Sequence, residues 1–158
     1  MRIKYLWILI IVLISCSPKI PATENATNPD AANTGTTTSD IPYIVAKRYF
    51  VKNDYQKQNS FNSMITTQTQ FDSIFGMAPI MGNKPTPIDF STQNVLFVIG
   101  ELTQKKTEII PISLQQQHGT ILFNYKIVEG EQTMATIQPA LIVVLDKKYK
   151  GEVKLIKN

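Results

Sequence analysis

The alternation of apolar and polar residues on both sides of His118-Gly119 constrains the fold of this chain more than any other feature. From residue 120 to 128 every second residue is apolar and would share one face of a strand: Ile121, Phe123, Tyr125 and Ile127. A period of two is typical of a half-buried β-strand, and a Gly-containing pair between two such runs is typical of a tight turn. The sequence therefore predicts a β-hairpin over residues 107–128.

The first strand of this hairpin is less regular than the second. Over residues 108–116 the alternation predicts one shared side for Ile110, Ile112 and Leu114. Pro111 lies among them and cannot donate a hydrogen bond to a neighbouring strand, so the strand is expected to be an edge strand or a bulged one.

Other β-rich runs surround the hairpin, and they are predicted at residues 43–51, 60–66, 94–100, 140–145 and 152–157. Two of them, 94–100 and 140–145, are almost continuously apolar, which indicates strands covered on both faces. These runs predict a mainly β fold, borderline α+β, with about seven strands in an antiparallel β-sandwich or flattened barrel.

One short helix is predicted near residues 67–76. Thr67 and Gln70 fit a capping box at its start, and Gly76 fits the C′ position after its end. Phe71, Ile74 and Phe75 have the spacing of an apolar stripe. A helix of about two turns is not stable alone, so its aromatic face is expected to dock on a sheet.

The N-terminus has the pattern of an export signal. Arg2 and Lys4 precede an apolar run of ten residues, Tyr5–Ile14. As a helix this run would rise about 15 Å, which is too short for a hydrocarbon core of about 30 Å. Leu13, Ile14, Ser15 and Cys16 resemble the lipobox of bacterial lipoproteins. The resemblance implies a lipoprotein signal peptide over residues 1–15 and acylation, as with palmitate, at Cys16; an ordinary signal peptide with a chance cysteine is the alternative.

The segment after Cys16 has the composition of a tether. Residues 17–41 are mostly Ser, Thr, Asn, Ala, Pro and Gly and contain no aromatic residue, which predicts a flexible stalk before a single β-rich domain over residues 42–158. No acidic pair follows Cys16, whereas some lipoproteins carry an acidic export signal there. The expected location is therefore the bacterial cell envelope, with the periplasmic face of the outer membrane favoured over the cell surface.

A Pro-, Gly- and Met-rich loop is predicted over residues 76–88. Loops of this length in compact domains are often functional. Met77, Ile80 and Met81 are the candidate partner-binding residues within it. The alternative is a covering flap whose methionines fill gaps in the core.

Residue counts disfavour several kinds of chemistry. One cysteine and one histidine leave no intrachain disulfide framework, Cys/His zinc site or Cys/His catalytic pair. His118 is predicted in a solvated turn, and Asp89 as a turn residue rather than a site acid. A net charge of +4 without a basic stripe argues against nucleic-acid binding. We predict no catalytic residues, no metal and no cofactor.

Each of two surface features has both a functional and a non-functional explanation. Asp72-Ser73-Ile74 resembles a bacterial O-glycosylation site, although such tripeptides arise by chance. The C-terminal lysines suggest either an anionic-lipid patch or a solvated sheet edge protected by charge; they are Lys147, Lys148, Lys150, Lys154 and Lys157.

The order of motifs resembles the C-terminal domain of PrcB-type lipoproteins, which are accessory subunits of bacterial surface protease complexes. The matching features are the aromatic helix, the Pro-rich loop, Asp89-Phe90, the glycine after a buried strand at Gly100, and Pro139 before a valine-rich strand. The family usually has a Gly-Gly-Tyr stretch after that strand, and residues 101–106 depart from it. A chagasin-like protease inhibitor is a more distant alternative.

Two functions follow from these patterns. The first is a membrane-tethered, non-enzymatic lipoprotein whose β domain binds a protein partner, such as a subunit of a protease complex. The second is a small periplasmic hydrolase or carbohydrate-binding module with a cleft under the 76–88 loop. A deep pocket with converging polar groups would favour the second function, and an apolar-rimmed surface would favour the first.

Overall fold

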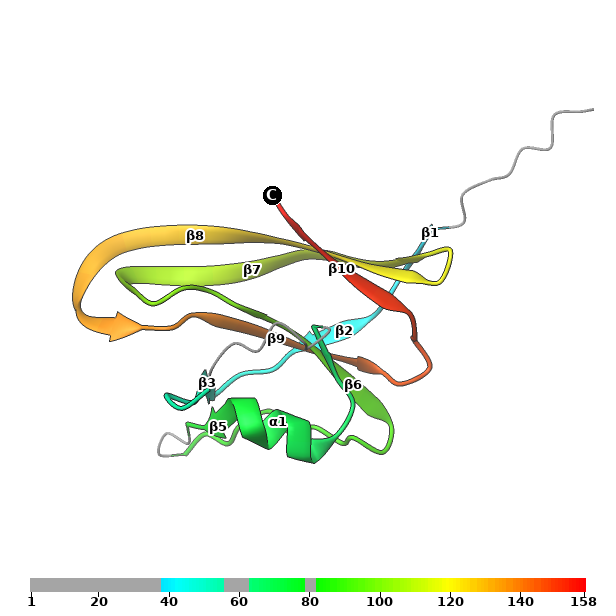
Figure 1. The fold of residues 1–158 in the computed structure, drawn as a ribbon, viewed down its shortest axis with the longest axis horizontal. Helices are drawn as coiled ribbons and strands as arrows, with labels where there is room; N and C mark the ends of the chain where they lie inside the picture. The colour runs from blue at the N-terminus through cyan, green and yellow to red at the C-terminus, as the bar shows by residue number, and fades with distance from the viewer. Residues whose placement is uncertain (1–37, 56–62, 79–81) are drawn as a thin grey trace, which may run out of the picture. The chain divides into compact units, whose positions relative to one another are not determined.

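The computed structural model describes residues 38–55, 63–78 and 82–158, and over them the chain has a mainly β fold of ten strands and one helix. Figure 1 shows the strands in tiers, with the helix below them. The strands form two four-stranded sheets and one two-stranded sheet, an arrangement consistent with a β-sandwich rather than a closed barrel. The structure has more strands than the predicted seven or so. One predicted run divides into two strands, and two short strands, β1 and β5, were not predicted.

The predicted hairpin is confirmed and is longer than expected. Strand β7 (Thr103–Gln117) pairs with β8 (Thr120–Ile137) in antiparallel register across His118 and Gly119. Both turn residues have positive φ, 48° for His118 and 78° for Gly119. This is the backbone of a type I′ turn, whose twist matches that of the two strands.

The expected common side of Ile110, Ile112 and Leu114 is wrong, because a register shift lies between Pro111 and Ser113. Ile109 and Leu114 are the buried residues of β7, whereas Ile112 is exposed. Residues five apart can face the core together only if the strand carries one extra residue. The bulge expected at Pro111 therefore exists, and it reverses the alternation that predicted the buried side.

Two strands flank the hairpin in the first sheet, whose order is β1-β7-β8-β10. Strand β10 (Glu152–Lys157) runs parallel to β8, while β1 (Thr38–Asp40) runs antiparallel to the end of β7. Ile41, directly after β1, is buried in the core. The predicted boundary between tether and domain at residue 42 is therefore wrong, since the fold already includes residues 38–41.

The second sheet has the order β2-β9-β6-β4. Its central strands are β6 (Gln93–Ile99) and β9 (Ala140–Asp146), and its edge strands are β2 (Tyr43–Val45) and β4 (Met64–Ile65). Both central strands carry runs of five buried residues, so the prediction of two strands covered on both faces is confirmed.

The two sheets share one folded ribbon. Strands β6 and β9 pair up to Ile99 and Ala140, and the chain then continues directly into β7 and β8. At this corner the Gly100 N–H donates to the Pro139 carbonyl at 2.8 Å. The ribbon thus turns back over itself and places the hairpin above β6 and β9, as Figure 1 shows.

Two hydrophobic clusters lie on opposite faces of the second sheet. Leu96, Val98 and Val143 belong to the cluster that also holds Ile121 and Phe123 of the hairpin. The other cluster takes the alternate residues of the same strands and packs them against the helix: Val95, Phe97, Ile142 and Val144. Because successive side chains of a strand point to opposite faces, one sheet contributes to two hydrophobic cores.

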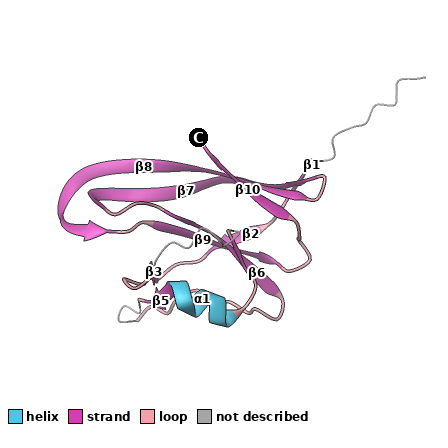
Figure 2. Cartoon of the chain, viewed as in Figure 1, coloured by secondary structure: helices cyan, strands magenta, loops and turns pink. Residues whose placement is uncertain are grey.

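The helix α1 (Gln68–Ile74), drawn in cyan in Figure 2, contributes Phe71 and Ile74 to the second cluster. Its apolar stripe is buried as predicted, at Phe71, Ile74 and Phe75. The Thr67 hydroxyl accepts from the Gln70 N–H at 3.3 Å, but Gln70 Oε1 accepts from the Thr66 N–H at 3.1 Å. A capping box would have Gln70 accept from the N–H of Thr67. Here Gln70 instead accepts from Thr66, one residue earlier.

The ends of the helix and of the first β run differ from the prediction. Gly76 lies in strand β5 (Phe75–Met77), not at a helix C′ position. Strand β5 pairs with β3 (Tyr49–Val51) to form the two-stranded sheet. The predicted strand over 43–51 divides at Arg48, whose φ is 69°, so β2 and β3 belong to different sheets.

Candidate functional site: a cleft beside helix α1

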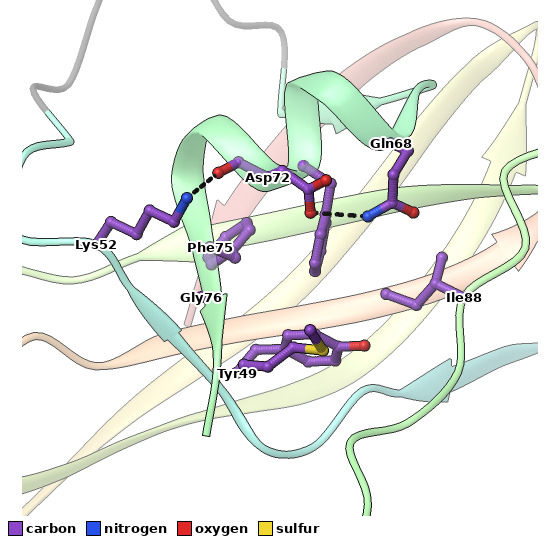
Figure 3. Close-up of a pocket in the computed structure, with 9 residues that line it drawn as sticks. Tyr49, Lys52, Gln68, Asp72, Phe75, Gly76 and Ile88 are labelled. Atoms are coloured by element: carbon purple, nitrogen blue, oxygen red, sulfur yellow. Dashed lines mark hydrogen bonds between the residues drawn. The ribbon is translucent and has the colours of Figure 1, made fainter. Parts of the chain in front are cut away.

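A partly open cleft of about 280 Å³ lies between helix α1, strands β3 and β5, and the segment that returns after the 76–88 loop. We call it the α1 cleft; Figure 3 shows the side chains around it. Nine residues line it: Tyr49, Lys52, Gln68, Phe71, Asp72, Phe75, Gly76, Met77 and Ile88. Three of these residues, Gly76, Met77 and Ile88, belong to the 76–88 segment under which the alternative function expects a cleft.

Aromatic rings form one side of the cleft. The rings of Phe71 and Tyr49 meet edge to face with centroids 5.0 Å apart, and those of Phe71 and Phe75 lie 5.1 Å apart. Edge-to-face and tilted contacts of this length are favourable because the positive ring edge meets the negative ring face. Phe71 and Phe75 point here because they share the apolar stripe that docks α1 on the sheet.

Strand β5 supplies the most accessible apolar side chain of the cleft. Met77 is opposite Tyr49 in the β3–β5 register and is 68% exposed. At the next pair the side chain of Phe50 covers Gly76, where an added Cβ would lie 2.5 Å from Phe50 Cζ. Because glycine has no side chain, the two strands and the Phe50 ring can approach each other closely next to the cleft.

The polar groups at the cleft already bind one another. The Gln68 side-chain amide donates to Asp72 Oδ1 at 2.8 Å, one turn along the helix. The Lys52 ammonium donates to the Asp72 main-chain carbonyl. Figure 3 marks both interactions with dashed lines. The rim is therefore polar, and two of its contacts are internal, while the Phe71 and Phe75 rings beneath it are almost fully buried.

Tyr49 is the polar group nearest the aromatic floor. Its hydroxyl donates to the Thr86 carbonyl at 2.6 Å, which ties β3 to the returning segment. Burial raises the pKa of Tyr49, and the nearby Asp72 carboxylate raises it further. The phenol therefore stays protonated at neutral pH and acts as a hydrogen-bond donor.

The composition of the cleft determines what it can do chemically. Its lining contains one carboxylate, Asp72, and neither histidine nor cysteine. Over the described residues, no group of three or more His, Cys, Asp or Glu side chains is arranged to hold a metal ion. The geometry suits the insertion of an apolar side chain, since clefts with apolar walls and a few fixed polar groups are typical recognition sites.

The structure locates one of the predicted site residues. Met77 lies at the α1 cleft, in strand β5 rather than in a loop. Ile80, Met81 and the lipidation residue Cys16 lie outside the described residues. The flap alternative does not hold for Met77, because this side chain is exposed rather than part of the core.

Three other residues noted in the sequence are not among those that line the α1 cleft. His118 forms the hairpin turn, as predicted. Asp89 is also a turn residue, and its carboxylate accepts from the Ser91 N–H at 2.9 Å and from the Ser91 hydroxyl at 2.6 Å. The Ser73 hydroxyl donates to the Gln70 carbonyl within α1 at 2.7 Å.

The C-terminal lysines are engaged in different places. The Lys147 ammonium donates to the Phe90 carbonyl at 2.8 Å, Lys148 lies 3.8 Å from the Asp146 carboxylate, and Lys157 lines a separate cavity. Lys150, Lys154 and Lys157 are exposed.

Sequence reasoning missed Tyr49, Lys52, Gln68 and Ile88 as cleft residues. Tyr49 falls near the end of the strand predicted over 43–51 and Lys52 directly follows it, and their position depends on the break at Arg48. Gln68 could have been found, because it precedes Asp72 by four residues on the predicted helix, a spacing that brings side chains together. No local signal places Ile88 beside them.

Over residues 38–55, 63–78 and 82–158, no helix is long and apolar enough to cross a membrane. Comparison of the chain with protein-family models, with curated proteins and with solved structures gives no match.

Proposed function

We propose that this protein is a membrane-tethered, non-enzymatic lipoprotein whose β domain binds a protein partner through the α1 cleft. The observation that carries the proposal is the exposed Met77 side chain at the mouth of an aromatic-walled cleft. Aromatic residues and methionine are enriched in the cores of protein interfaces, where an apolar anchor enters a preformed pocket.

The size of the α1 cleft supports a side-chain ligand. A volume of about 280 Å³ is at the low end for small-molecule pockets, which range from about 300 to 1,000 Å³. It suits one or two apolar side chains of a partner. Met77 can adapt to their shape because methionine is unbranched and flexible.

Contact is also better supported than catalysis. General acid–base chemistry needs a group with a suitable pKa within hydrogen-bond reach of the substrate. At the α1 cleft the Tyr49 phenol has a raised pKa and already donates to Thr86, while Asp72 Oδ1 already accepts from Gln68. These engagements support a recognition surface, although its rim, with Lys52, Gln68 and Asp72, is polar where the first function expected an apolar one.

Attachment to the membrane would make such a surface more effective. Acyl chains on Cys16 would hold the protein on a bilayer, because two or three chains anchor far more strongly than one. The tether before the domain would then raise the effective concentration of the α1 cleft near a membrane-associated partner. By resemblance to PrcB-type lipoproteins, that partner is a subunit of a protease complex at the cell envelope, and we favour the periplasmic face of the outer membrane.

Two methionines provide a matched test of the α1 cleft. Met77 lines the cleft, whereas Met134 is fully exposed on β8. Tagged full-length protein in native membranes should retain its partner in the wild type and in Met134→Ser. Met77→Ser should lower partner recovery by about tenfold, the effect of losing roughly 1.4 kcal/mol. Equal recovery from both variants, or loss in both, would contradict the assignment.

A separate variant tests the anchor. Cys16→Ala should abolish acyl labelling and move the protein from the detergent phase to the aqueous phase. Unchanged partition of this variant would show that Cys16 is not the anchor.

A further inference from the structure

Met77 is the only sulfur-containing residue among those that line the α1 cleft, and its side chain is 68% exposed. Strand β5 places it directly opposite Tyr49 and two residues after Phe75, on the same face of the strand. Directly opposed residues have Cβ atoms about 4.5–5.5 Å apart, so the thioether is within reach of the Tyr49 ring. The cleft therefore presents a solvent-accessible thioether beside its aromatic wall.

The other two methionines within the described ranges have different surroundings. Met64 packs against the main core, and its sulfur accepts from the Asn94 amide at 3.8 Å. Met134 is fully exposed on β8 and is not part of the cleft lining. Because an oxidant must reach the sulfur atom, exposure predicts fast oxidation at Met77 and Met134 and slow oxidation at Met64.

The chemistry of this oxidation is the transfer of one oxygen atom from a peroxide. The sulfur lone pair attacks a peroxide oxygen, and the S–O bond forms as the O–O bond breaks. The sulfur is oxidised by two electrons, and hydrogen peroxide is reduced to water. The product is methionine sulfoxide, which is polar and chiral, and methionine sulfoxide reductases convert it back to the thioether.

The surroundings of Met77 make this change costly for binding. Two side-chain donors of the cleft lining are already engaged: the Tyr49 hydroxyl donates to the Thr86 carbonyl at 2.6 Å, and the Gln68 amide donates to Asp72 at 2.8 Å. A sulfoxide oxygen covered by a partner would lose its bound water without gaining either donor, and burial of an unpaired polar group is unfavourable. Oxidation thus changes the exposed anchor of the cleft from an apolar side chain to a hydrated one.

We propose that Met77 is a reversible oxidation site, and that conversion of its thioether to the sulfoxide by a peroxide releases the protein partner from the α1 cleft. This regulation rests on the function proposed for the α1 cleft. Met134 takes up oxygen as well, but its oxidation leaves partner binding unchanged because it lies outside the cleft lining.

Oxidation rates test the site itself, on the full-length protein in detergent with dilute hydrogen peroxide. Peptide mass spectrometry, with fragment ions that separate neighbouring methionines, measures the gain of one oxygen atom at each position. Met77 and Met134 should be oxidised about tenfold faster than Met64, whose sulfur is the least accessible of the three. Equal rates at Met77 and Met64 would overturn the proposal.

Partner recovery tests the consequence, expressed for each variant as the ratio of peroxide-treated to untreated protein on native membranes. The ratio should fall to about one tenth for the wild type and for Met134→Leu, and methionine sulfoxide reductases should restore it. Met77→Leu has no thioether at this position, so its ratio should stay near one whatever its starting recovery. A wild-type ratio near one after full oxidation of Met77, or an equal fall in Met77→Leu, would overturn the proposal.

Two controls separate this regulation from other effects. Treated and untreated wild type should unfold at the same urea concentration, because Met77 is exposed; earlier unfolding of the treated protein would attribute the loss to the fold and contradict the proposal. Absence of a recovered partner before peroxide is added would contradict the function proposed for the α1 cleft, and this regulation with it. Recovery that survives oxidation of Met77 contradicts the regulation alone, so the two failures are distinguishable.

Discussion

The ring of Phe50 lies over Gly76, so that a Cβ atom at position 76 would stand 2.5 Å from Phe50 Cζ. Phe50 and Gly76 are directly opposite each other in the β3–β5 pair, and Phe50 is 47% exposed. An aromatic ring over a cross-strand glycine compensates for the side chain that the glycine lacks. This contact holds together the small sheet that carries Met77 to the α1 cleft.

A double-mutant cycle on this pair tests the contact. Gly76→Ala should lower the free energy of unfolding by about 1 kcal/mol, because the added methyl displaces the ring. In a Phe50→Ala background the same substitution should raise stability by about 0.5–1 kcal/mol, since alanine orders a strand at lower entropic cost than glycine. Urea unfolding of the four proteins gives the coupling, and identical effects in both backgrounds would mean that the ring and the glycine do not interact.

The helix face can be tested by truncation. Phe71 is buried and contacts the rings of Tyr49, Phe75 and Phe90. Phe71→Ala should lower the free energy of unfolding by about 3–5 kcal/mol, as expected for a fully buried ring. Phe50→Ala is the matched control and should cost much less because its ring is half exposed. A loss below about 1 kcal/mol for Phe71→Ala would mean that α1 is not docked as described.

Asn94 offers a test of buried polarity. It is buried, and among the described residues its Oδ1 has no hydrogen-bond partner and its amide donates only to Met64 Sδ at 3.8 Å. Asn94→Leu should raise the free energy of unfolding by about 1–2 kcal/mol, because an unsatisfied buried polar group costs about 1–3 kcal/mol. Asn94→Asp should lower stability at neutral pH, with a deficit that shrinks as pH falls and the carboxyl is protonated. A stability loss in Asn94→Leu would indicate that the amide has a polar role.

The turn at Asp89 predicts a pH dependence. Hydrogen bonds from the Ser91 hydroxyl, the Ser91 N–H and the Thr92 hydroxyl lower the pKa of Asp89, and the charge of Lys147 adds to them. A carboxyl with a lowered folded-state pKa stabilises the fold above its unfolded pKa of about 3.9, and this contribution is lost as pH falls through the folded pKa. Asp89→Asn should therefore be less stable than wild type at pH 7, and the difference should shrink as pH falls through the lowered folded-state pKa. A difference that stays constant between pH 7 and pH 3 would refute this role.

Much of the fold could be predicted because its determinants are local. The alternation from Ile121 to Ile127 and the turn at His118-Gly119 specify one hairpin, and the structure confirms it. The continuous apolar runs in β6 and β9 indicated burial on two faces, and two clusters use those faces. A helix cap and an apolar stripe were enough to predict α1.

The rest depends on non-local geometry. Pro111 indicated an edge or bulged strand, but the alternation could not show that the irregularity between Pro111 and Ser113 changes which side of β7 is buried. The positive φ of Arg48 divides one predicted strand between two sheets. Thr38–Asp40 has the composition of the tether and becomes a strand only because the end of β7 offers it a partner. The α1 cleft brings together residues from segments far apart in the sequence. Met77 was predicted from its own loop, but the positions of Tyr49 and Ile88 depend on how these segments pack.

The central claim is that the protein acts by contact at the α1 cleft, and site-specific photo-crosslinking in intact cells tests it most directly. Benzoyl-phenylalanine replaces Met77 in one full-length protein and Met134 in the other, and both are illuminated on their native membrane. The account predicts one discrete adduct of defined mass from position 77 and none from position 134. The same adduct from both positions, or none from position 77 while the protein is folded and membrane-bound, would contradict it.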